Sequence, residues 1–199
     1  MYNVDQKLVD ELERIPGNVR GAVIIENLNF LERKAGQERV NKVKQRFREF
    51  SCDIDLDNLK PLEFYPEHYS VLLILMVAEI LDFKEEDVFK MGEESFKYAS
   101  FIKFFVTYFV SIERCFKEAP KYWQRHFDFG KIEKVEFNGE ERYAVFRVIG
   151  YKFHPIMCIY HKGCFYQIAQ LAIGTKKVSL EETKCVFRGD PHHEYVIRW

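Results

Sequence analysis

The sequence predicts an α+β fold, in which N-terminal helices pack on an antiparallel sheet and the C-terminal half is ordered β-β-α-β-β. Through the first 130 residues, apolar side chains recur at three- and four-residue steps, which is the helical period. From Lys131 the period changes to two, and Asn138-Gly139 stands between two apolar runs, which is a strong hairpin signal. We therefore expect a single ligand-binding domain over residues 1–199, helical over residues 1–130 and α/β over residues 131–199.

The helical region divides at its proline and glycine residues. We expect helices over residues 4–15, 19–35 and 37–50, although Ala22–Ile25 within the second could also form a short strand. Pro66 opens a further helix, and its run over residues 69–81 is apolar nearly all round, so this helix should be central and buried. A short acidic helix over residues 84–91 should end near Gly92, followed by a long helix over residues 93–118 that Ala119-Pro120 breaks.

The C-terminal region contains two hairpins around one helix. The helix should run from Pro155 to Ile173 and stop at Gly174. The second hairpin, Val178–Trp199, turns at Arg188–Pro191, a cluster of residues that favour turns. Together with the Asn-Gly hairpin, this gives the β-β-α-β-β order.

Composition excludes several classes of protein. The formal net charge is −1, which offers no general attraction to nucleic acid or to an anionic membrane. The most apolar run is about a dozen residues long, too short to span a bilayer, and the polar N-terminus is unlike a signal peptide. Five cysteines without framework spacing indicate reduced thiols, so we expect a cytoplasmic protein.

A stripe of aromatic side chains on the predicted long helix is a candidate wall for a ligand pocket. Such pockets are lined mostly by apolar and aromatic groups. Core packing would explain the same stripe. With two residues of the central helix, the candidate pocket residues are Tyr69, Leu73, Phe101, Phe104, Phe105, Tyr108 and Ile112.

Metal-capable side chains gather around the turn of the second hairpin: Glu182, Cys185, His192 and His193. In an unbroken strand Glu182 and Cys185 would face opposite sides, because three residues is an odd step in a period of two. A β-bulge near Thr183 would bring them to one side. The alternative is that Cys185 acts as a small buried hydrophobic residue and the histidines are exposed turn residues.

The C-terminal half also resembles a known domain. The resemblance rests on a helix ending in Leu171–Gly174, a strand carrying Glu181–Cys185, then Gly189–Pro191 and an alternating strand with Tyr195 and Ile197. This order is similar to the 4-vinyl-reductase (hydrocarbon-binding) domain, whose signature is Glu-x-x-Cys, Gly-Asp and a second Cys followed by Phe. The sequence departs from it at the last position.

The N-terminal half is similar to a family of uncharacterised bacterial proteins related to haem NO-binding domains. The matching positions are Gly21, Leu28, Gly36, Phe64–Pro66, Met91–Ser95 and Pro120–Gly130 with Trp123. Together the two resemblances imply the ligand-binding fold shared by NO-signalling and Golgi-transport proteins, often dimeric and with a small-molecule cavity.

The resemblance also implies a metal set. Aromatic-responsive activators with a similar domain hold a structural zinc with Cys, Glu, Cys and Cys. By position these ligands fall on Cys158, Glu182, Cys185 and His193, and His193 stands where Cys is usual. Zinc accepts sulfur, nitrogen and oxygen donors in a tetrahedron, so the substitution is chemically tolerable.

Haem is not expected from the sequence. His126, His154 and His161 are candidate iron ligands, but the Tyr-x-Ser-x-Arg motif of haem NO sensors is absent and no Cys-x-x-Cys-His occurs. Nor is an enzyme expected, because no Gly-rich phosphate loop, Gly-x-Ser-x-Gly or His-Glu-x-x-His motif is present.

The sequence-based hypothesis is a non-catalytic sensory domain that holds a small apolar molecule between helices and sheet. Its signal would leave through a homodimer or a separate signalling protein. Two alternatives stay open: a ligand-free interaction module of the Golgi-tethering type, and a haem-based gas sensor.

Overall fold

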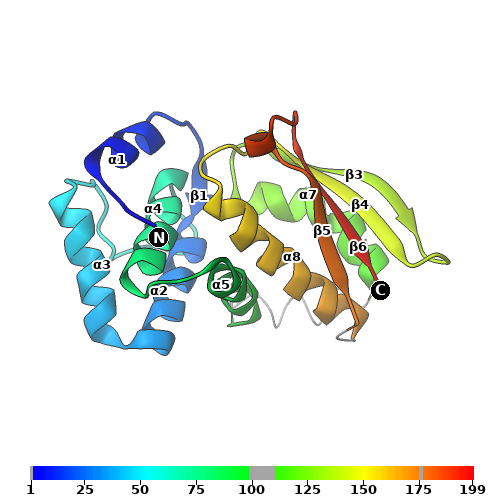
Figure 1. Ribbon diagram of the computed structural model, residues 1–199, viewed down its shortest axis with the longest axis horizontal. Helices are drawn as coiled ribbons and strands as arrows, with labels where there is room; N and C mark the ends of the chain where they lie inside the picture. The colour runs from blue at the N-terminus through cyan, green and yellow to red at the C-terminus, as the bar shows by residue number, and fades with distance from the viewer. Residues whose placement is uncertain (1, 99–110, 175–176) are drawn as a thin grey trace.

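The computed structural model describes residues 2–98, 111–174 and 177–199. Helices occupy one half of the molecule and a four-stranded antiparallel sheet the other, with α5 and α8 between them (Figure 1). The helices are α1 (Gln6–Glu13), α2 (Gly21–Ala35), α3 (Gln37–Glu49), α4 (Glu67–Ile80), α5 (Glu85–Tyr98), α7 (Ile112–His126) and α8 (Ile156–Ile173). This arrangement confirms the predicted α+β class.

The large sheet has the strand order β3-β4-β6-β5. Its strands are β3 (Lys131–Asn138), β4 (Tyr143–Ile149), β5 (Ser179–Lys184) and β6 (His193–Arg198), with a 3-10 turn (Val186–Arg188) between the last two. Both predicted hairpins are present, and α8 lies between them in the chain, so the β-β-α-β-β order is confirmed. The side chain of Asn138 accepts hydrogen bonds from the backbone N–H groups of Glu140 and Glu141, which shapes the first turn.

Helix α4 is the centre of the helical half. Every residue from Val71 to Ala78 is at most 1% exposed, which confirms the central, buried helix predicted from the all-round apolar run. Helices α1, α2 and α3 pack around it. Helix α2 ends at Gly36, as the sequence indicates, but it begins at Gly21 and not at Val19, because residues 18–20 form a strand.

A short two-stranded pair was not predicted. Strand β1 (Asn18–Arg20) pairs with β2 (Phe64–Pro66), and each strand leads directly into a helix. Helices α2 and α4 therefore start side by side. Gly21 at the start of α2 permits this approach, because a Cβ there would lie 2.3 Å from the Lys60 carbonyl oxygen.

Two expected helix boundaries are wrong. Gly92 does not end a helix. It lies inside α5, where a Cβ would come within 2.1 Å of the backbone carbonyl oxygen of Tyr160 in α8. The absence of a side chain at this position allows α5 and α8 to pack closely. The other error is Pro120, which lies inside α7. The packing of α7 on β3 holds the helix across the lost backbone donor. The helix expected over residues 93–118 is divided between α5 and α7, and residues 99–110 are outside the described ranges.

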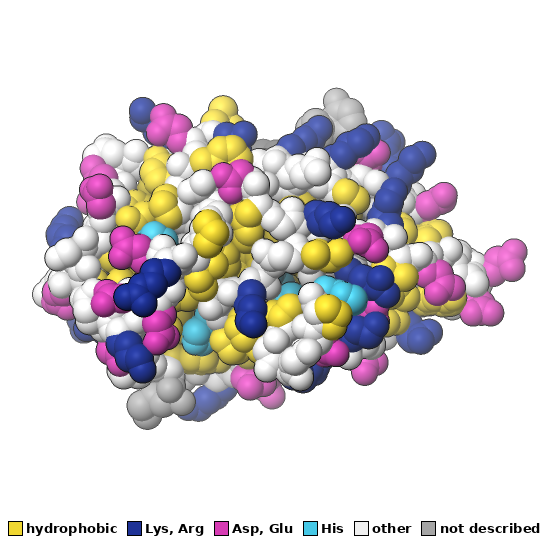
Figure 2. Space-filling view, turned by 90° about the horizontal axis from the view of Figure 1, so that it is seen from above, with side chains coloured by type: hydrophobic (Ala, Val, Ile, Leu, Met, Phe, Trp, Pro, Cys, Tyr) yellow, Lys and Arg dark blue, Asp and Glu magenta, His cyan; other side chains and the backbone are white. Residues whose placement is uncertain are grey.

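No helix in the described part of the chain is long and apolar enough to cross a membrane. On the face seen in Figure 2, basic and acidic side chains are interspersed, as the net charge of −1 suggests.

Candidate functional site

A pocket lies where the two halves meet. It is bounded by α7, α8, the inner face of the sheet and the first turns of α2 and α4. Its volume is about 160 Å³. An engineered apolar cavity of about 150 Å³ binds benzene, so this pocket accommodates a single-ring molecule without rearrangement.

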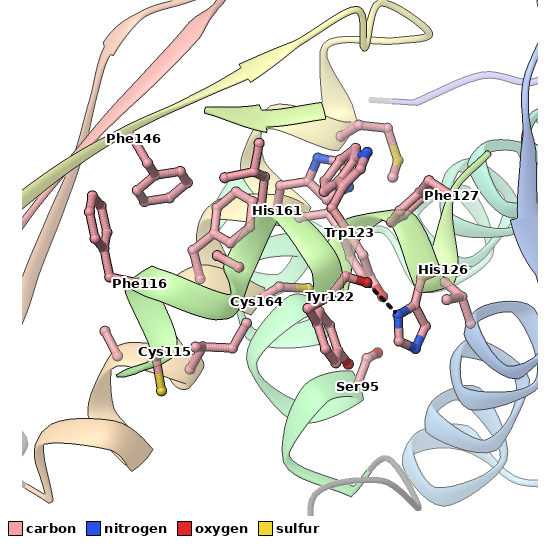
Figure 3. Close-up of a pocket in the computed structure, with 18 of the residues that line it drawn as sticks. Ser95, Cys115, Phe116, Tyr122, Trp123, His126, Phe127, Phe146, His161 and Cys164 are labelled. Carbon is pink, nitrogen blue, oxygen red and sulfur yellow. Dashed lines mark hydrogen bonds between the residues drawn. The ribbon is translucent and has the colours of Figure 1, made fainter. Parts of the chain in front are cut away.

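The walls of the pocket are predominantly aromatic and aliphatic. Figure 3 shows the Phe116 and Phe146 rings at one end and Trp123, Phe127 and His161 gathered at the other. The Trp123 and Phe127 rings stack, with their centroids 4.3 Å apart. These two residues are four positions apart along the chain, so the end of α7 and the residue after it present them on one side.

His161 is the most buried histidine in the pocket wall. It is 8% exposed, and its ring contacts that of Tyr151 at a centroid distance of 4.7 Å. Within the described residues neither of its ring nitrogens has a hydrogen-bond partner. Burial lowers the pKa of His161 to about 3, so the ring is neutral at physiological pH and carries a lone pair. A neutral imidazole of this kind is an iron ligand in many haem proteins.

The other two candidate histidines differ in role. His126 also lines the pocket, and its Nδ1 donates to the Tyr122 carbonyl oxygen at 3.0 Å (Figure 3). That bond places the lone pair of the neutral ring on Nε2. His154 lies elsewhere: its Nδ1 accepts from the backbone N–H of Ile156 at 3.1 Å and so caps the start of α8. His154 is therefore a structural residue.

The pocket has a polar end at the first turn of α4. Glu67 is 0% exposed, and the hydroxyl of Tyr151 donates to its Oε1 at 2.5 Å. Burial raises the pKa of Glu67 to about 8, so the side chain is a neutral acid at pH 7. Among the residues that the structure describes, neither Glu67 Oε2 nor Ser70 Oγ has a hydrogen-bond partner, although both atoms are buried.

Only some of the predicted pocket residues lie at this pocket. Ile112 lines it. Tyr69 and Leu73 belong to the helical core, where the Tyr69 hydroxyl donates to the Asp53 carbonyl oxygen. They do not line the pocket: Tyr69 is in the first turn of α4 but packs into the helical core, and Leu73 lies one turn further along the helix. The others, Phe101, Phe104, Phe105 and Tyr108, lie outside the described residues.

A second cluster lies at the end of the sheet, beside the start of α8. One ligand atom each from Cys158, Glu182, Cys185 and His193 falls within 4.8 Å of the others. The two sulfur atoms are 3.6 Å apart, and Cys158 Sγ is 3.8 Å from His193 Nδ1. The β-bulge anticipated near Thr183 is present, since the β5–β6 register shifts between Glu182 and Lys184.

The hydrogen bonds of His193 direct one nitrogen into this cluster. Nε2 lies 3.0 Å from the Tyr151 carbonyl oxygen and donates to it, so Nδ1 carries the lone pair. Nδ1 in turn faces Glu182 Oε1 at 2.9 Å. Two electron-rich atoms at that distance require a proton or a cation between them. Burial raises the pKa of the Cys158 thiol, so without a cation the thiol stays protonated.

Comparison with known proteins identifies the fold. No protein-family model matches the sequence, and no curated protein matches it. Among solved structures, an H-NOX protein from S. oneidensis in the Fe(II)NO ligation state has 14% identity and a TM-score of 0.69, covering 90% of this chain and 98% of that chain. An oxygen-binding H-NOX domain related to soluble guanylate cyclases has 13% identity and a TM-score of 0.64, covering 90% and 94%.

A third similar structure is an unliganded Fe(II) H-NOX protein from K. algicida that carries a point mutation, with 14% identity and a TM-score of 0.62 over 90% of this chain and 95% of that chain. At such identities the likeness shows the fold alone. The chain therefore has the H-NOX fold, in agreement with the fold that the resemblance to haem NO-binding domains implied. The comparisons do not support the 4-vinyl-reductase assignment.

The cofactor expectation needs correction. Haem was not expected, yet the similar structures include iron(II) proteins and one described by the redox potential of its haem and the distortion of its porphyrin. The expectation depended on a missing linear motif, and such a motif can be lost while the fold is kept. Zinc, which the resemblance implied, has no support in these comparisons.

The residues of the pocket fit a haem in three respects, and the volume sets a condition. The neutral His161 imidazole can donate to iron, and apolar walls suit a porphyrin. Lys134, the one lysine or arginine among the described lining residues, suits a propionate. The condition is size. Sites for drug-sized ligands have volumes of about 300 Å³ or more, whereas this pocket has about 160 Å³. Wall side chains such as Phe116 would therefore have to move to admit a haem.

Proposed function

We propose that this chain is a non-catalytic sensory domain that holds haem in the pocket between α7, α8 and the sheet, and that a diatomic gas is its signal. One observation carries the proposal: a buried, neutral His161 faces an apolar pocket in a chain with the H-NOX fold. When bound, haem would supply an iron atom able to bind a gas molecule.

The residues of this chain would have distinct roles in that site. His161 would hold the iron, and the Trp123–Phe127 stack would exclude water beside it. Lys134 would pair with a propionate at the sheet side of the pocket. The signal would pass to a partner protein or a second copy of the chain, through α8 or the sheet, which both border the pocket.

Three histidine variants test this proposal. We expect His161→Ala to lose most haem binding, measured by absorbance during titration of the purified protein with haemin, and added imidazole to restore it. His154→Ala is the matched control, because it removes an imidazole that caps α8 outside the pocket. His126→Ala tests the other lining histidine. Equal haem binding by wild type and His161→Ala would exclude His161 as the ligand.

A second candidate function is the binding of a small apolar molecule without haem. The cavity volume of about 160 Å³ favours it, because that is the size of a single ring. Native mass spectrometry of the purified chain distinguishes the two candidates. Haem adds its own mass and colour, whereas a single-ring compound adds a small mass to a colourless protein.

We also propose that Cys158, Glu182, Cys185 and His193 bind a divalent transition-metal ion. The proximity of their four ligand atoms supports this, as does the outer hydrogen bond of His193, which is typical of ligating histidines. With four protein ligands the site would be closed and structural, fastening the second hairpin to the start of α8.

A further inference from the structure

Two buried polar side chains at the α4 end of the pocket lack partners. Glu67 Oε2 and Ser70 Oγ are both inaccessible to solvent, and no described residue bonds to either atom. Both residues line the pocket. They are three positions apart on α4, so they lie one above the other on the same helix face. An isolated buried polar atom is unfavourable, and two at one end of an apolar cavity call for an explanation.

The hydrogen bond from Tyr151 determines what this end of the pocket offers. The Tyr151 hydroxyl donates to Oε1, so that oxygen is already an acceptor. With its pKa raised to about 8 by burial, Glu67 is protonated at pH 7, and the acid proton belongs on Oε2. The neighbouring Ser70 hydroxyl adds a second donor that can rotate. The pair therefore presents hydrogen-bond donors to the cavity.

Two other polar side chains of the pocket wall, Ser95 and Glu26, are already engaged. Ser95 Oγ donates to Asn27 Oδ1 at 3.0 Å, and the Tyr160 hydroxyl donates to the same oxygen at 2.8 Å. Glu26 pairs with Arg33 at 3.1 Å. Glu67 Oε2 and Ser70 Oγ, in contrast, have no hydrogen-bond partner among the described residues and are open to a ligand.

We propose that Glu67 and Ser70 form a polar subsite that binds the hydrogen-bond-accepting oxygen of a small neutral ligand, such as a ketone, whose single apolar ring packs against the aromatic walls of the pocket. The inference shares with the proposed function the premise that this pocket takes a ligand. It does not depend on iron, because the subsite lies on α4 and the cavity already has the volume of one ring.

The test compares two ligands of nearly equal shape, cyclohexanone and methylenecyclohexane, by calorimetric titration of the purified protein. The first has an acceptor oxygen where the second has a methylene group. The quantity of interest is the ratio of their affinities in each variant divided by that in wild type, because this removes the difference in ligand hydration. We expect the preference for the ketone to fall about three- to tenfold in Ser70→Ala and in Glu67→Leu, the range for one or two neutral hydrogen bonds.

Three further variants or readouts make the result decisive. Glu67→Gln keeps an acceptor for Tyr151 and a donor for the cavity, so it should retain the preference. Ser95→Ala removes a lining hydroxyl that is already bonded to Asn27, and should also leave the preference unchanged. Circular dichroism checks that each variant folds, and Ser70→Ala serves if Glu67→Leu does not fold, because it leaves the Tyr151–Glu67 bond intact.

An unchanged preference in folded Ser70→Ala and Glu67→Leu would overturn the inference. Failure of haem-free wild type to bind either compound would also overturn it. Neither result bears on the haem proposal, which is judged by haemin absorbance and by His161→Ala. A haem-free protein that nevertheless prefers the ketone through Ser70 would support the subsite while rejecting haem.

Discussion

The hydroxyl of Tyr151 donates a hydrogen bond to Oε1 of Glu67 across 84 residues of sequence. This bond joins the segment after β4 to the first turn of α4, and so links the sheet half to the helical half. Tyr151 also contacts His161 through its ring and His193 through its carbonyl oxygen. One residue therefore connects the pocket histidine, the polar end of the pocket and the metal-ligand cluster.

The buried acid makes stability dependent on pH. The pKa of Glu67 rises from 4.5 to about 8 on folding because of burial, so between these values the folded state binds a proton that the unfolded state has lost. Stability must then fall as pH rises through this window. We expect Glu67 to lower the free energy of unfolding by about 3 kcal/mol between pH 5.5 and pH 8.

Glu67→Gln should remove this dependence, because the amide keeps the acceptor for Tyr151 and does not ionise. Urea denaturation of wild type and variant at pH 5.5 and pH 8 measures it. The variant should gain stability relative to wild type as pH rises. Parallel profiles would show that Glu67 does not carry the raised pKa.

Close contact between α5 and α8 should not tolerate a side chain. A Cβ at Gly163 would lie 2.0 Å from the Phe89 carbonyl oxygen, and backbone cannot rotate away as a side chain can. We expect Gly163→Ala to destabilise the fold by about 3 kcal/mol or more in thermal or urea denaturation. Gly174→Ala is the control: its φ is +71° but nothing lies within 4 Å, so only backbone strain of about 1 kcal/mol is expected. Equal losses in both variants would contradict the close-contact explanation.

The four-residue cluster should bind cobalt(II) as a spectroscopic probe. We expect reduced wild-type protein to develop thiolate-to-metal charge-transfer and visible ligand-field bands on titration with Co²⁺, with Cys158→Ser and Cys185→Ser weakening both. Cys115→Ser is a matched control, because Cys115 is a buried free thiol of α7 outside the cluster. Spectra without these bands in the wild type would exclude the metal site.

Local sequence signals predicted most elements well. The Asn138-Gly139 turn, the stop at Gly174 and the all-apolar α4 depend on neighbours in sequence, and the structure has each of them. Gly92 and Pro120 gave wrong helix boundaries, because whether these residues end a helix depends on packing. Gly92 meets α8 in space, and α7 continues past Pro120 against β3.

For the candidate sites too, features set by local geometry were predictable and features set by packing were not. The need for a bulge at Thr183 followed from strand geometry, and it brings Glu182 and Cys185 to one side. The pocket was harder to place. The spacing of Trp123 and Phe127 was a usable signal. Their contacts with His161 join the end of α7 to α8, and no local sequence pattern indicates that pairing.

The most direct test of the central claim is the absorption spectrum of the freshly purified chain, expressed with a haem precursor, together with its haem-to-protein ratio. The account predicts a Soret band, about one haem per chain, and a shift of that band when NO or CO is added to the reduced protein. A folded protein that has no Soret band, and that acquires none after incubation with haemin, would contradict it.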